Sequence, residues 1–566
     1  MPPGRDFAVV LTQRDHRPPL TGSASLEVGP WDVQVAGAPT RSVHGDVTVL
    51  LKGQVYDTPI SALAMGYAAH GPAFVRGLHG AFSMVVLDAR AGEVLAVTDH
   101  VGTHKLYAAH DGTRVIVSTR ADHPEFVVRP YRPEAVAAVL AHGTPLNGTA
   151  LYQGVCGLES ASIHHVTAVG MMSRPYWALR PPAGASARPA APMSDDLLDE
   201  YVFLLRQAVR RRRPAAESVH LSLSGGHDSR GLLALLTLEG QEVRTFAYGL
   251  RADIPYTDAY AAAQLATQYG VSFEPVVAYH GDLPGTIRRN AAWGQGVTNF
   301  CEEADVWARL DGHVEHLFTG EHVHGLHRDE LPSIDEQLAQ LHIGPGRTIA
   351  WFTDLLDAAA ARQLQEAYHG ELERVRGSAV AHPHARQQHF TLMASQRLPH
   401  MLLPWRERFG GHHAAVHFPY LDRDVLEFIH RLPPGALAGK VFFQQALRRI
   451  DPQAYRVPLA RTSGYQADWT AELARHRDRL EEELLSHPSR LDALVSPDVL
   501  RTLLHTTLEP SARGSLRRRV RSALGQLRHG ALLSRVLGHA TIRAHPVGRT
   551  ELLLRALTLR ALDAPG

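Results

Sequence analysis

The feature that most constrains this 566-residue chain is the segment Leu221–Arg230, which reads LSLSGGHDSR. A short apolar run, Val219–Leu223, has the character of a strand, and Arg230–Leu238 has helical spacing. The two glycines between them let the backbone turn sharply and approach a ligand where a Cβ would collide. Free N–H groups at the helix start, with the positive end of the helix dipole, form an anion site. The sequence therefore predicts a phosphate-binding loop between a strand and a helix.

The loop differs from the commoner phosphate-binding motifs. It lacks the Gly-Lys-Ser or Gly-Lys-Thr of a Walker loop, and it does not have the G-x-G-x-x-G spacing of dinucleotide-binding folds. Ser224 and Ser229 add hydroxyl donors. Asp228 would repel a phosphate, so we interpret it as a ligand of Mg²⁺ that bridges phosphates. The alternative is a Ser-Gly-Gly turn that binds nothing.

The hydrophobic pattern divides the chain into two parts, which together predict an α/β protein. Residues 1–178 carry short β-type runs and predict a β-rich layered domain, and the Pro- and Ala-rich stretch 179–193 predicts a linker. In 194–566, strands first alternate with helices, which predicts a doubly wound parallel sheet, and a mostly helical part follows. The expected strands are Phe7–Leu11, Val47–Leu51, Ala81–Leu87, Val94–Thr98, Val115–Ser118, Val219–Leu223 and Val243–Ala247. The expected helices are Ser61–His70, Pro133–His142, Leu197–Arg211, Arg230–Leu238 and Thr257–Tyr269.

Composition excludes several classes of function. Lys+Arg is 58 and Asp+Glu is 57, a balance that does not indicate a nucleic-acid partner. With only two cysteines, a disulfide scaffold is excluded. The sequence contains no run of about 18 apolar residues, so it predicts no integral membrane span. The first residues lack the layout of a signal peptide, so we expect a cytoplasmic protein. Lysine occurs only at Lys52, Lys105 and Lys440, which leaves few candidates for lysine-dependent chemistry.

Further segments, taken in order, resemble the asparagine synthetase superfamily over roughly residues 5–470. The Ser-Gly-Gly-x-Asp-Ser loop is similar to the pyrophosphate loop of ATP pyrophosphatases. The other segments that carry the resemblance are Gly53–Asp57, Leu78–Phe82, Asp99–Tyr107, Thr245–Leu250, Leu317–Gly325 and Phe418–Asp422. The resemblance implies Mg²⁺ and an ATP site formed by Ser222, Leu223, Ser224, Gly225, Gly226, Asp228, Ser229, Tyr248, Gly249 and Gly320.

The N-terminal part is similar to the class II glutamine amidotransferase domain of that superfamily, which has an Ntn-hydrolase-like fold. Glutaminases of this type use a cysteine at residue 2, whose thiolate is the nucleophile. Residue 2 here is Pro2, and Cys156 and Cys301 lie far along the chain. We therefore expect this domain to be inactive as a glutaminase and to have a structural role.

Without ammonia from glutamine, the attacking amine is expected to belong to the substrate. The resemblance then favours a lasso-peptide cyclase, an ATP-dependent C–N ligase that releases AMP and pyrophosphate and joins the N-terminal amine of a peptide to an acidic side chain. Its expected partners are a precursor peptide, a leader peptidase and a leader-binding module. A β-lactam synthetase or an ammonia-dependent asparagine synthetase-like ligase is the alternative. A non-catalytic scaffold is a third hypothesis.

The segment Leu317–Gly325 resembles the family's S-G-x-G-x-D-E turn. Glu321 falls where the family places a group for proton transfer, and a carboxylate there can accept the proton of the attacking ammonium. His324 aligns with an aspartate that binds a second Mg²⁺, although Mg²⁺ prefers oxygen ligands. With His322 and His327 it forms a short histidine run, for which loop residues or a zinc site are alternatives.

The remaining expected catalytic residues come late in the chain. Glu407 is either the second member of a proton-transfer dyad or a surface residue paired with Arg406 or Arg408. The family's late lysine is absent, so Arg461 is expected to clamp the pyrophosphate, with Lys440 as the alternative. An arginine-rich helix is predicted over Ser511–His529, which is either a solvated face or a docking surface for an acidic peptide.

Overall fold

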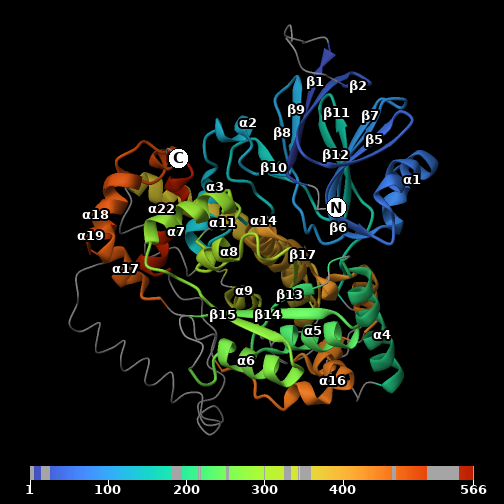
Figure 1. Ribbon diagram of the computed structural model, residues 1–566. Helices are drawn as coiled ribbons and strands as arrows, with labels where there is room; N and C mark the ends of the chain where they lie inside the picture. Colours follow the sequence, from blue (N-terminus) through green and yellow to red (C-terminus); the bar gives the residue numbers. More distant parts are fainter. Residues whose placement is uncertain are drawn as a thin grey trace.

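The computed structural model describes residues 5–14, 26–181, 194–214, 216, 218–249, 254–298, 300–323, 333–341, 343, 358–432, 434–437, 439–461, 467–506 and 547–564. His324, the arginine-rich segment and most of the predicted linker lie outside these residues. Within them the chain forms a β-rich N-terminal sandwich, a parallel sheet with helices on both faces, and a helical region (Figure 1). The predicted α/β class is confirmed. In the part of the chain that is described, no helix is long and apolar enough to cross a membrane.

Two antiparallel sheets form the N-terminal sandwich, and each has six strands. Apolar side chains from both sheets, among them Leu11, Leu50 and Val85, meet in one core between them. The first sheet has the order β10 (Val155–Gly157), β8 (Tyr107–His110), β9 (Arg114–Ser118), β1 (Phe7–Gln13), β3 (Trp31–Gly37) and β2 (Leu26–Val28). The second has the order β12 (Gly170–Pro175), β11 (Ser162–Thr167), β7 (Glu93–Thr98), β6 (His79–Asp88), β5 (Val47–Tyr56) and β4 (Thr40–His44).

Helices cover both outer faces of the sandwich, and this explains why its central strands are apolar on both sides. One face of β6 contacts the first sheet, and the other contacts α1 (Leu63–His70). The outer face of the first sheet packs on α3 (Pro133–His142), whose bounds match the predicted helix. Pro133 suits the first turn of that helix, and Gly143, at φ 96°, ends it.

The parallel sheet has the strand order β15 (Ser272–Val277), β14 (Glu242–Gly249), β13 (Ser218–Ser222), β16 (His316–Phe318) and β17 (Ala415–His417). One face packs on α4 (Asp195–Arg211), α5 (His227–Leu238), α6 (Asp258–Tyr269), α15 (Arg423–Arg431) and α16 (Val441–Ile450). The other face packs on α8 (Ala304–Leu310) and on Phe409. The predicted doubly wound sheet is therefore confirmed, although its two shortest strands lie in the part expected to be helical.

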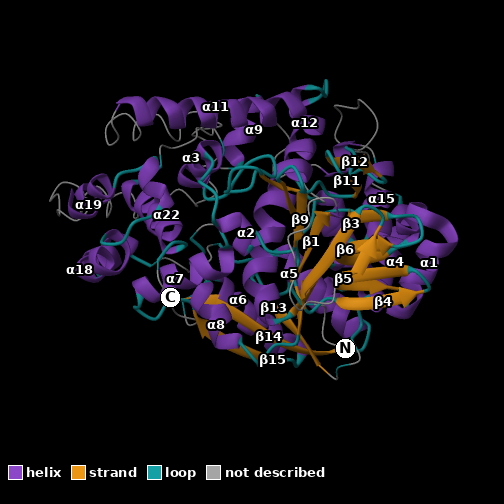
Figure 2. Cartoon of the chain, turned by 90° about the horizontal axis from the view of Figure 1, so that it is seen from above, coloured by secondary structure: helices purple, strands orange, loops and turns teal. Residues whose placement is uncertain are grey.

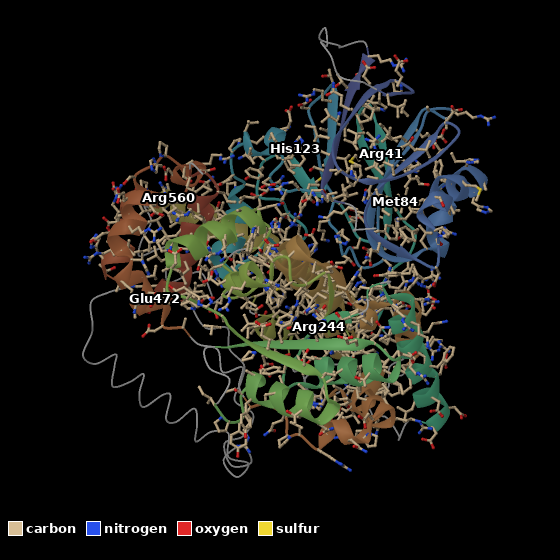
Figure 3. The ribbon with its side chains drawn as sticks, in the orientation of Figure 1. Arg41, Met84, His123, Arg244, Glu472 and Arg560 are labelled. Atoms are coloured by element: carbon tan, nitrogen blue, oxygen red, sulfur yellow. The ribbon has the colours of Figure 1, made fainter. Side chains whose placement is uncertain are left out.

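A second helical layer packs α3 of the N-terminal part against helices of the C-terminal part (Figure 2). There α3 packs against α11 (Ala358–Val380) and α22 (Arg549–Ala561), together with α7 (Leu283–Gly294) and α19 (Pro497–Thr506). Arg560, labelled in Figure 3, is buried there and bonds the carbonyl of Leu484 at 2.7 Å. This apolar core therefore contains residues from both sides of the predicted 179–193 linker.

Short elements complete the described chain, and most of them link the larger helices and strands. In the N-terminal part these are η2 (Ile60–Ala62), η3 (Gly71–Gly77) and α2 (Pro124–Val127). Towards the C-terminus they are α9 (Ile334–Gln340), α12 (Ala385–Leu392), η5 (Met393–Leu402), α13 (Leu403–Trp405), η6 (Arg406–Gly410), α14 (Gly411–His413), η7 (Pro419–Leu421), η8 (Pro434–Leu437), η9 (Pro452–Tyr455), α17 (Trp469–Arg475), α18 (Arg477–Leu480), η10 (Glu481–Leu485) and η11 (Arg490–Ala493).

A buried ion pair fastens the sandwich to the parallel-sheet domain. Asp422 accepts hydrogen bonds from Arg212 at 2.7 Å and from Arg211 at 2.9 Å. Tyr56 of β5 lies under the Arg212 guanidinium at 4.7 Å, so this charge pair contacts the sandwich directly. Burial raises the pKa of Asp422, but the Arg212 and Arg211 guanidiniums outweigh it and hold that pKa below its usual value.

Replacing Asp422 with asparagine leaves the Arg212 charge buried without its counter-charge. We expect Asp422→Asn to lower the free energy of unfolding by about 3–5 kcal/mol, measured by urea denaturation. Asp424→Asn is the matched control, because Asp424 also binds Arg211 but is partly exposed, and it should cost about 1 kcal/mol or less.

The pH dependence of the free energy of unfolding, compared between wild type and Asp422→Asn, tests the same ion pair. The depressed pKa of Asp422 contributes stability above its unfolded value of 3.8, and that contribution is lost as the pH falls towards the folded value. The difference between wild type and Asp422→Asn should therefore shrink in acid. A difference that stays constant down to the acid transition would contradict this account.

Candidate active site

The predicted phosphate loop is shaped by its own side chains. β13 ends at Ser222, the buried Leu223 continues the strand pairing, and α5 begins after Gly226. The Ser229 hydroxyl accepts the Ser224 N–H at 2.9 Å, and the two serine hydroxyls lie 2.9 Å apart. Gly226 has no side chain to cap the first turn of α5, so the N–H groups of that turn are left for a ligand. The loop therefore places two hydroxyls and an uncapped helix start at the carboxyl edge of the sheet, an arrangement that suits an anion.

A buried arginine holds the loop from behind. The Arg230 guanidinium donates to the Gly225 carbonyl at 3.2 Å and also to the carbonyls of Ala454, Val457 and Pro458. Ala460 N–H donates to the same Gly225 carbonyl at 3.2 Å. The segment 454–461 is thus tied to the back of the loop, an arrangement that sequence reasoning did not anticipate.

Space around the glycines shows which of them the fold requires. A Cβ on Gly225 would lie 2.3 Å from the Ala460 Cβ and 2.8 Å from the Ala261 Cβ. On Gly226 it would meet only the Ser224 hydroxyl, at 3.4 Å. Gly225 is therefore needed for packing, whereas Gly226 leaves room on the open side of the loop.

Asp228 lies at the mouth of the loop between two nitrogen groups. Its carboxylate is 2.9 Å from His322 Nε2 and 3.2 Å from Lys440 Nζ. Burial raises the pKa of Asp228, but the neighbouring His322 and Lys440 outweigh it and hold that pKa well below its usual value. An ionised carboxylate here fits Mg²⁺, which takes oxygen ligands. The predicted second ligand, His324, lies outside the described residues.

The two candidate cations for the pyrophosphate take different positions. Lys440, at φ 58°, precedes α16 and reaches Asp228 directly. Arg461 donates its N–H to the Tyr256 carbonyl, and its guanidinium lies 4.5 Å from the centre of the Tyr256 ring. Lys440 is therefore the cation already at the loop mouth, although the sequence favoured Arg461.

Glu321 lies at the same edge of the sheet, just after β16, and its carboxylate accepts a hydrogen bond from Arg406 Nε at 2.6 Å. Gly320 packs against Asp228, whose Cβ would be 3.1 Å from any Cβ added at 320. The predicted Tyr248 and Gly249 end β14 at this edge, next to β13. The carboxyl ends of parallel strands lie at one edge of the sheet. The loop, Glu321 and Tyr248 each follow or end a strand, so all three lie at this edge.

A buried acid that sequence reasoning missed joins this group. Tyr248 hydrogen-bonds Glu303, which precedes α8 and faces Arg406. Burial raises the pKa of Glu303 to about 7, against a smaller opposing effect of Arg406. No motif marks Glu303 in the sequence, because only the fold brings it beside Arg406.

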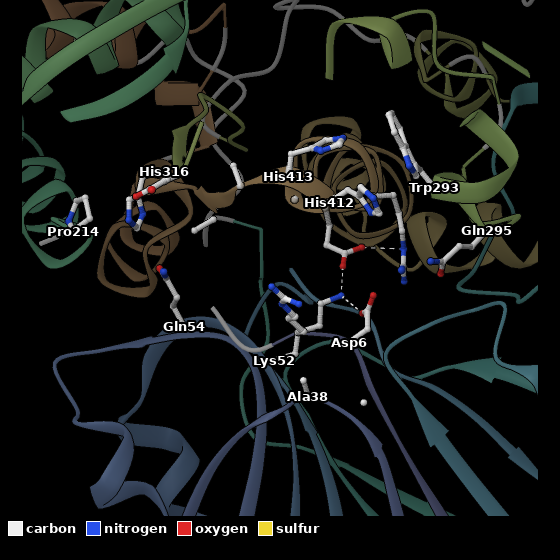
Figure 4. Close-up of a pocket in the computed structure, with 18 of the residues that line it drawn as sticks. Asp6, Ala38, Lys52, Gln54, Pro214, Trp293, Gln295, His316, His412 and His413 are labelled. Carbon is white, nitrogen blue, oxygen red and sulfur yellow. Dashed lines mark hydrogen bonds and ion pairs between the residues drawn. The ribbon is translucent and has the colours of Figure 1, made fainter. Parts of the chain in front are cut away.

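Glu407 points away from this group, towards the sandwich. It pairs with Lys52, and its Oε2 lies 2.9 Å from Arg408 Nε, while Asp6 binds Lys52 at 2.7 Å (Figure 4). Its ion pairs among the described residues are with Lys52, His104 and Arg408, whereas Glu321 is bonded by Arg406. Its pairing with Arg408 matches the alternative interpretation, but Glu407 is buried rather than on the surface.

The ion pairs of Glu407 line a cavity of about 1220 Å³ between the sandwich and the amino edge of the parallel sheet. Gln54 of the sandwich lies on one side of it, and Trp293, His412 and His413 lie on the other (Figure 4). The cavity therefore lies at the amino edge of the parallel sheet, whereas the phosphate loop lies at its carboxyl edge.

Two family models match this chain. One is described as a glutamine amidotransferase domain and matches residues 40–123. The other is described as asparagine synthase and matches residues 201–310 and 315–528, which is more than half of the chain. No curated protein matches.

Two solved structures are also similar, each at 10% sequence identity. Glutamine phosphoribosylpyrophosphate amidotransferase from B. subtilis, in complex with ADP and GMP, is covered over 85% of its chain and 49% of this one, with a TM-score of 0.22. The allosteric regulatory enzyme of purine biosynthesis is covered over 77% of its chain and 50% of this one, with a TM-score of 0.21. We draw no argument from similarities at this level.

The two loop glycines give a matched pair of variants. Gly225→Ala should lower the free energy of unfolding by about 1–3 kcal/mol, because the new methyl group collides with Ala460 and Ala261. Gly226→Ala should change it by about 0.5 kcal/mol or less. Urea denaturation of the two variants provides the measurement, and equal losses would show that the packing at Gly225 is not as described.

Proposed function

This chain belongs to the asparagine synthase family, and from that premise we propose that it closes a macrolactam in a peptide, as lasso-peptide cyclases do. Membership makes it an ATP-dependent ligase that forms amide bonds. The macrolactam, the residue roles and the peptide substrate are our proposal. It rests above all on the loop 224–229, whose serine hydroxyls and uncapped helix start suit an anion, with the Asp228 carboxylate at its mouth.

The first step is activation of a substrate carboxylate. Its oxygen attacks the α-phosphorus of ATP, and the bond from that phosphorus to pyrophosphate breaks, which leaves an acyl-adenylate. Backbone N–H groups in the first turn of α5 and the hydroxyls of Ser224 and Ser229 hold the departing pyrophosphate, whereas the Gly225 N–H is bonded to Asp258. Bound Mg²⁺ would neutralise phosphate charge, with Asp228 as its ligand. Lys440 supplies a further positive charge at the loop mouth.

The second step forms the amide, and we assign the attacking amine to the substrate itself. Neither cysteine of the chain is placed as a glutaminase nucleophile. Cys156 contacts the Ala108 carbonyl at the sandwich edge, and Cys301 accepts a hydrogen bond from Trp405 in the other domain. Burial raises the pKa of the Cys301 thiol, which disfavours the reactive thiolate, and Cys156 is exposed on β10. An amine on the same peptide gains the effective concentration that a free amine lacks.

Glu321 receives the proton that the attacking ammonium loses. It follows β16 at the edge of the sheet that carries the loop, and Arg406 holds its carboxylate in place by a hydrogen bond. The nitrogen–carbon bond forms, the bond between that carbon and the AMP oxygen breaks, and AMP leaves.

Mass spectrometry tests the reaction. With ATP and Mg²⁺, a synthetic peptide that carries a free N-terminal amine and an internal Asp or Glu should lose one water, with one AMP released per ring. The same peptide with its N-terminus acetylated is the control and should stay linear. Release of AMP with aspartate and ammonium, or with a β-amino acid, but with no such peptide, would favour the alternative ligases.

Variants of the loop mouth test the residue roles. We expect Asp228→Asn and Lys440→Met each to lower kcat/KM by at least about 100-fold. The first removes the carboxylate proposed to bind Mg²⁺, and the second removes the positive charge proposed to neutralise the phosphates. Arg461→Met should cost less, since its guanidinium stacks on Tyr256. Asp424→Asn, at the interdomain ion pair, is the control for folding. Full activity of Asp228→Asn would contradict the role of Asp228, whereas release of no AMP by wild type with any of these substrates would support a scaffold on this fold instead.

A further inference from the structure

His322 lies between the phosphate loop and helix α16. It follows β16, on the same segment as Glu321. Its ring Nε2 is 2.9 Å from Oδ1 of Asp228, and 6% of its side chain is exposed. The histidine run of the sequence thus places one buried imidazole against the carboxylate that is proposed to bind Mg²⁺.

Two aromatic side chains hold the His322 ring. Phe443 of α16 packs against it with ring centres 4.9 Å apart, and Tyr420 meets it edge-on at 6.0 Å. Both aromatic residues are buried, and the Tyr420 hydroxyl donates to the main-chain carbonyl of Asp228 at 2.9 Å. The ring is therefore fixed relative to Asp228 by packing that does not depend on charge.

Lys440 contacts the same carboxylate but is held less firmly. Its Nζ is 3.2 Å from Oδ2 of Asp228, 3.3 Å from Oδ1 and 3.2 Å from His322 Nε2. A lysine ammonium is a compact charge on a flexible chain of four carbons, so it can exchange one anion for another. Phosphates at the loop 224–229 carry more negative charge than one carboxylate and compete for this ammonium.

The two contacts of His322 Nε2 also compete with each other. The nitrogen of a neutral imidazole is either a donor, which suits Asp228, or an acceptor, which suits Lys440. When phosphate draws Lys440 away, the donor form of the ring has Asp228 as its partner. The bond between His322 and Asp228 therefore outlasts the bond between Lys440 and Asp228.

We propose that His322 is a positioning residue for Asp228, which keeps Oδ1 bonded while Lys440 passes from Oδ2 to the phosphates. Oδ2 is then the oxygen that Mg²⁺ takes. Loss of a hydrogen bond that orients a metal ligand typically lowers metal affinity about 10- to 100-fold. This inference rests on the proposed role of Asp228 and goes beyond it, because it gives separate tasks to the two neighbours of that carboxylate.

Nucleotide affinity with and without metal tests this role in the full-length protein, with no turnover involved. The ligand is α,β-methylene-ATP, which cannot form the adenylate, and calorimetry measures its affinity with saturating Mg²⁺ and again with EDTA. In His322→Leu the affinity with Mg²⁺ should fall about tenfold, whereas the affinity with EDTA should stay within about twofold of wild type. His322→Gln retains an N–H donor and should recover most of the affinity with Mg²⁺.

Two further variants complete the experiment. Lys440→Met should weaken binding of the analogue both with Mg²⁺ and with EDTA, because its charge acts on the phosphates themselves. His316→Leu is the matched control, since His316 begins β16 at its amino end and bonds His417 instead. It should bind the analogue as wild type does under both conditions.

The outcomes separate this inference from the proposed function. An equal loss with Mg²⁺ and with EDTA in His322→Leu would overturn the role of His322, as would a His322→Gln protein that binds no better than His322→Leu. If Asp228→Asn keeps the full gain in affinity that Mg²⁺ gives wild type, the role of Asp228 fails, and that of His322 fails with it. Wild type that binds no analogue under either condition would contradict the proposed function itself, together with this inference.

Discussion

The guanidinium of Arg230 holds together the parts on which the active site depends. It is buried and donates to main-chain carbonyls of the loop and of the segment 454–458. A buried charge costs free energy unless its hydrogen bonds are satisfied, and these carbonyls satisfy it only when the two segments meet. The loop shape is thereby coupled to the position of the chain that leads to Arg461. Side-chain bonds within the loop then fix its detail.

The parallel sheet divides the remaining charges into two groups with different roles. At its carboxyl edge, Asp228 pairs with Lys440 and Glu321 pairs with Arg406. Towards the sandwich, Glu407 is fully compensated by Lys52 and Arg408. Burial raises the pKa of Glu407, but these cations hold it well below its usual value, so it remains charged and cannot exchange protons near neutrality. Glu407 is therefore a structural charge, and Glu321, at the edge that carries the loop, is the acid of the proposed reaction.

The sequence predicts helices, strands and turns well where short-range hydrophobic periodicity and turn residues determine them. The strand–loop–helix around Gly225, the strands of the sandwich and the helix Pro133–His142 follow from short-range periodicity and turn residues. The strands β16 and β17 are too short to show a period, and they form because neighbouring strands supply hydrogen bonds. The surroundings of Glu303 and the hydrogen bonds of Arg230 also come from residues distant in the sequence, which no local pattern encodes. Of the two interpretations of Glu407, the pairing with Arg408 is the one that the structure shows, because Arg406 rather than Glu407 faces Glu321.

The most direct test of the account follows an oxygen atom. A cyclising peptide whose acceptor carboxyl group carries a heavy oxygen isotope is incubated with ATP and Mg²⁺, and the nucleotide product is analysed by mass spectrometry. Attack of that carboxylate on the α-phosphorus leaves one labelled oxygen on AMP after the amide forms. Labelled AMP together with pyrophosphate is the predicted result, whereas ADP with phosphate, or AMP without the label, would contradict activation at the 224–229 loop.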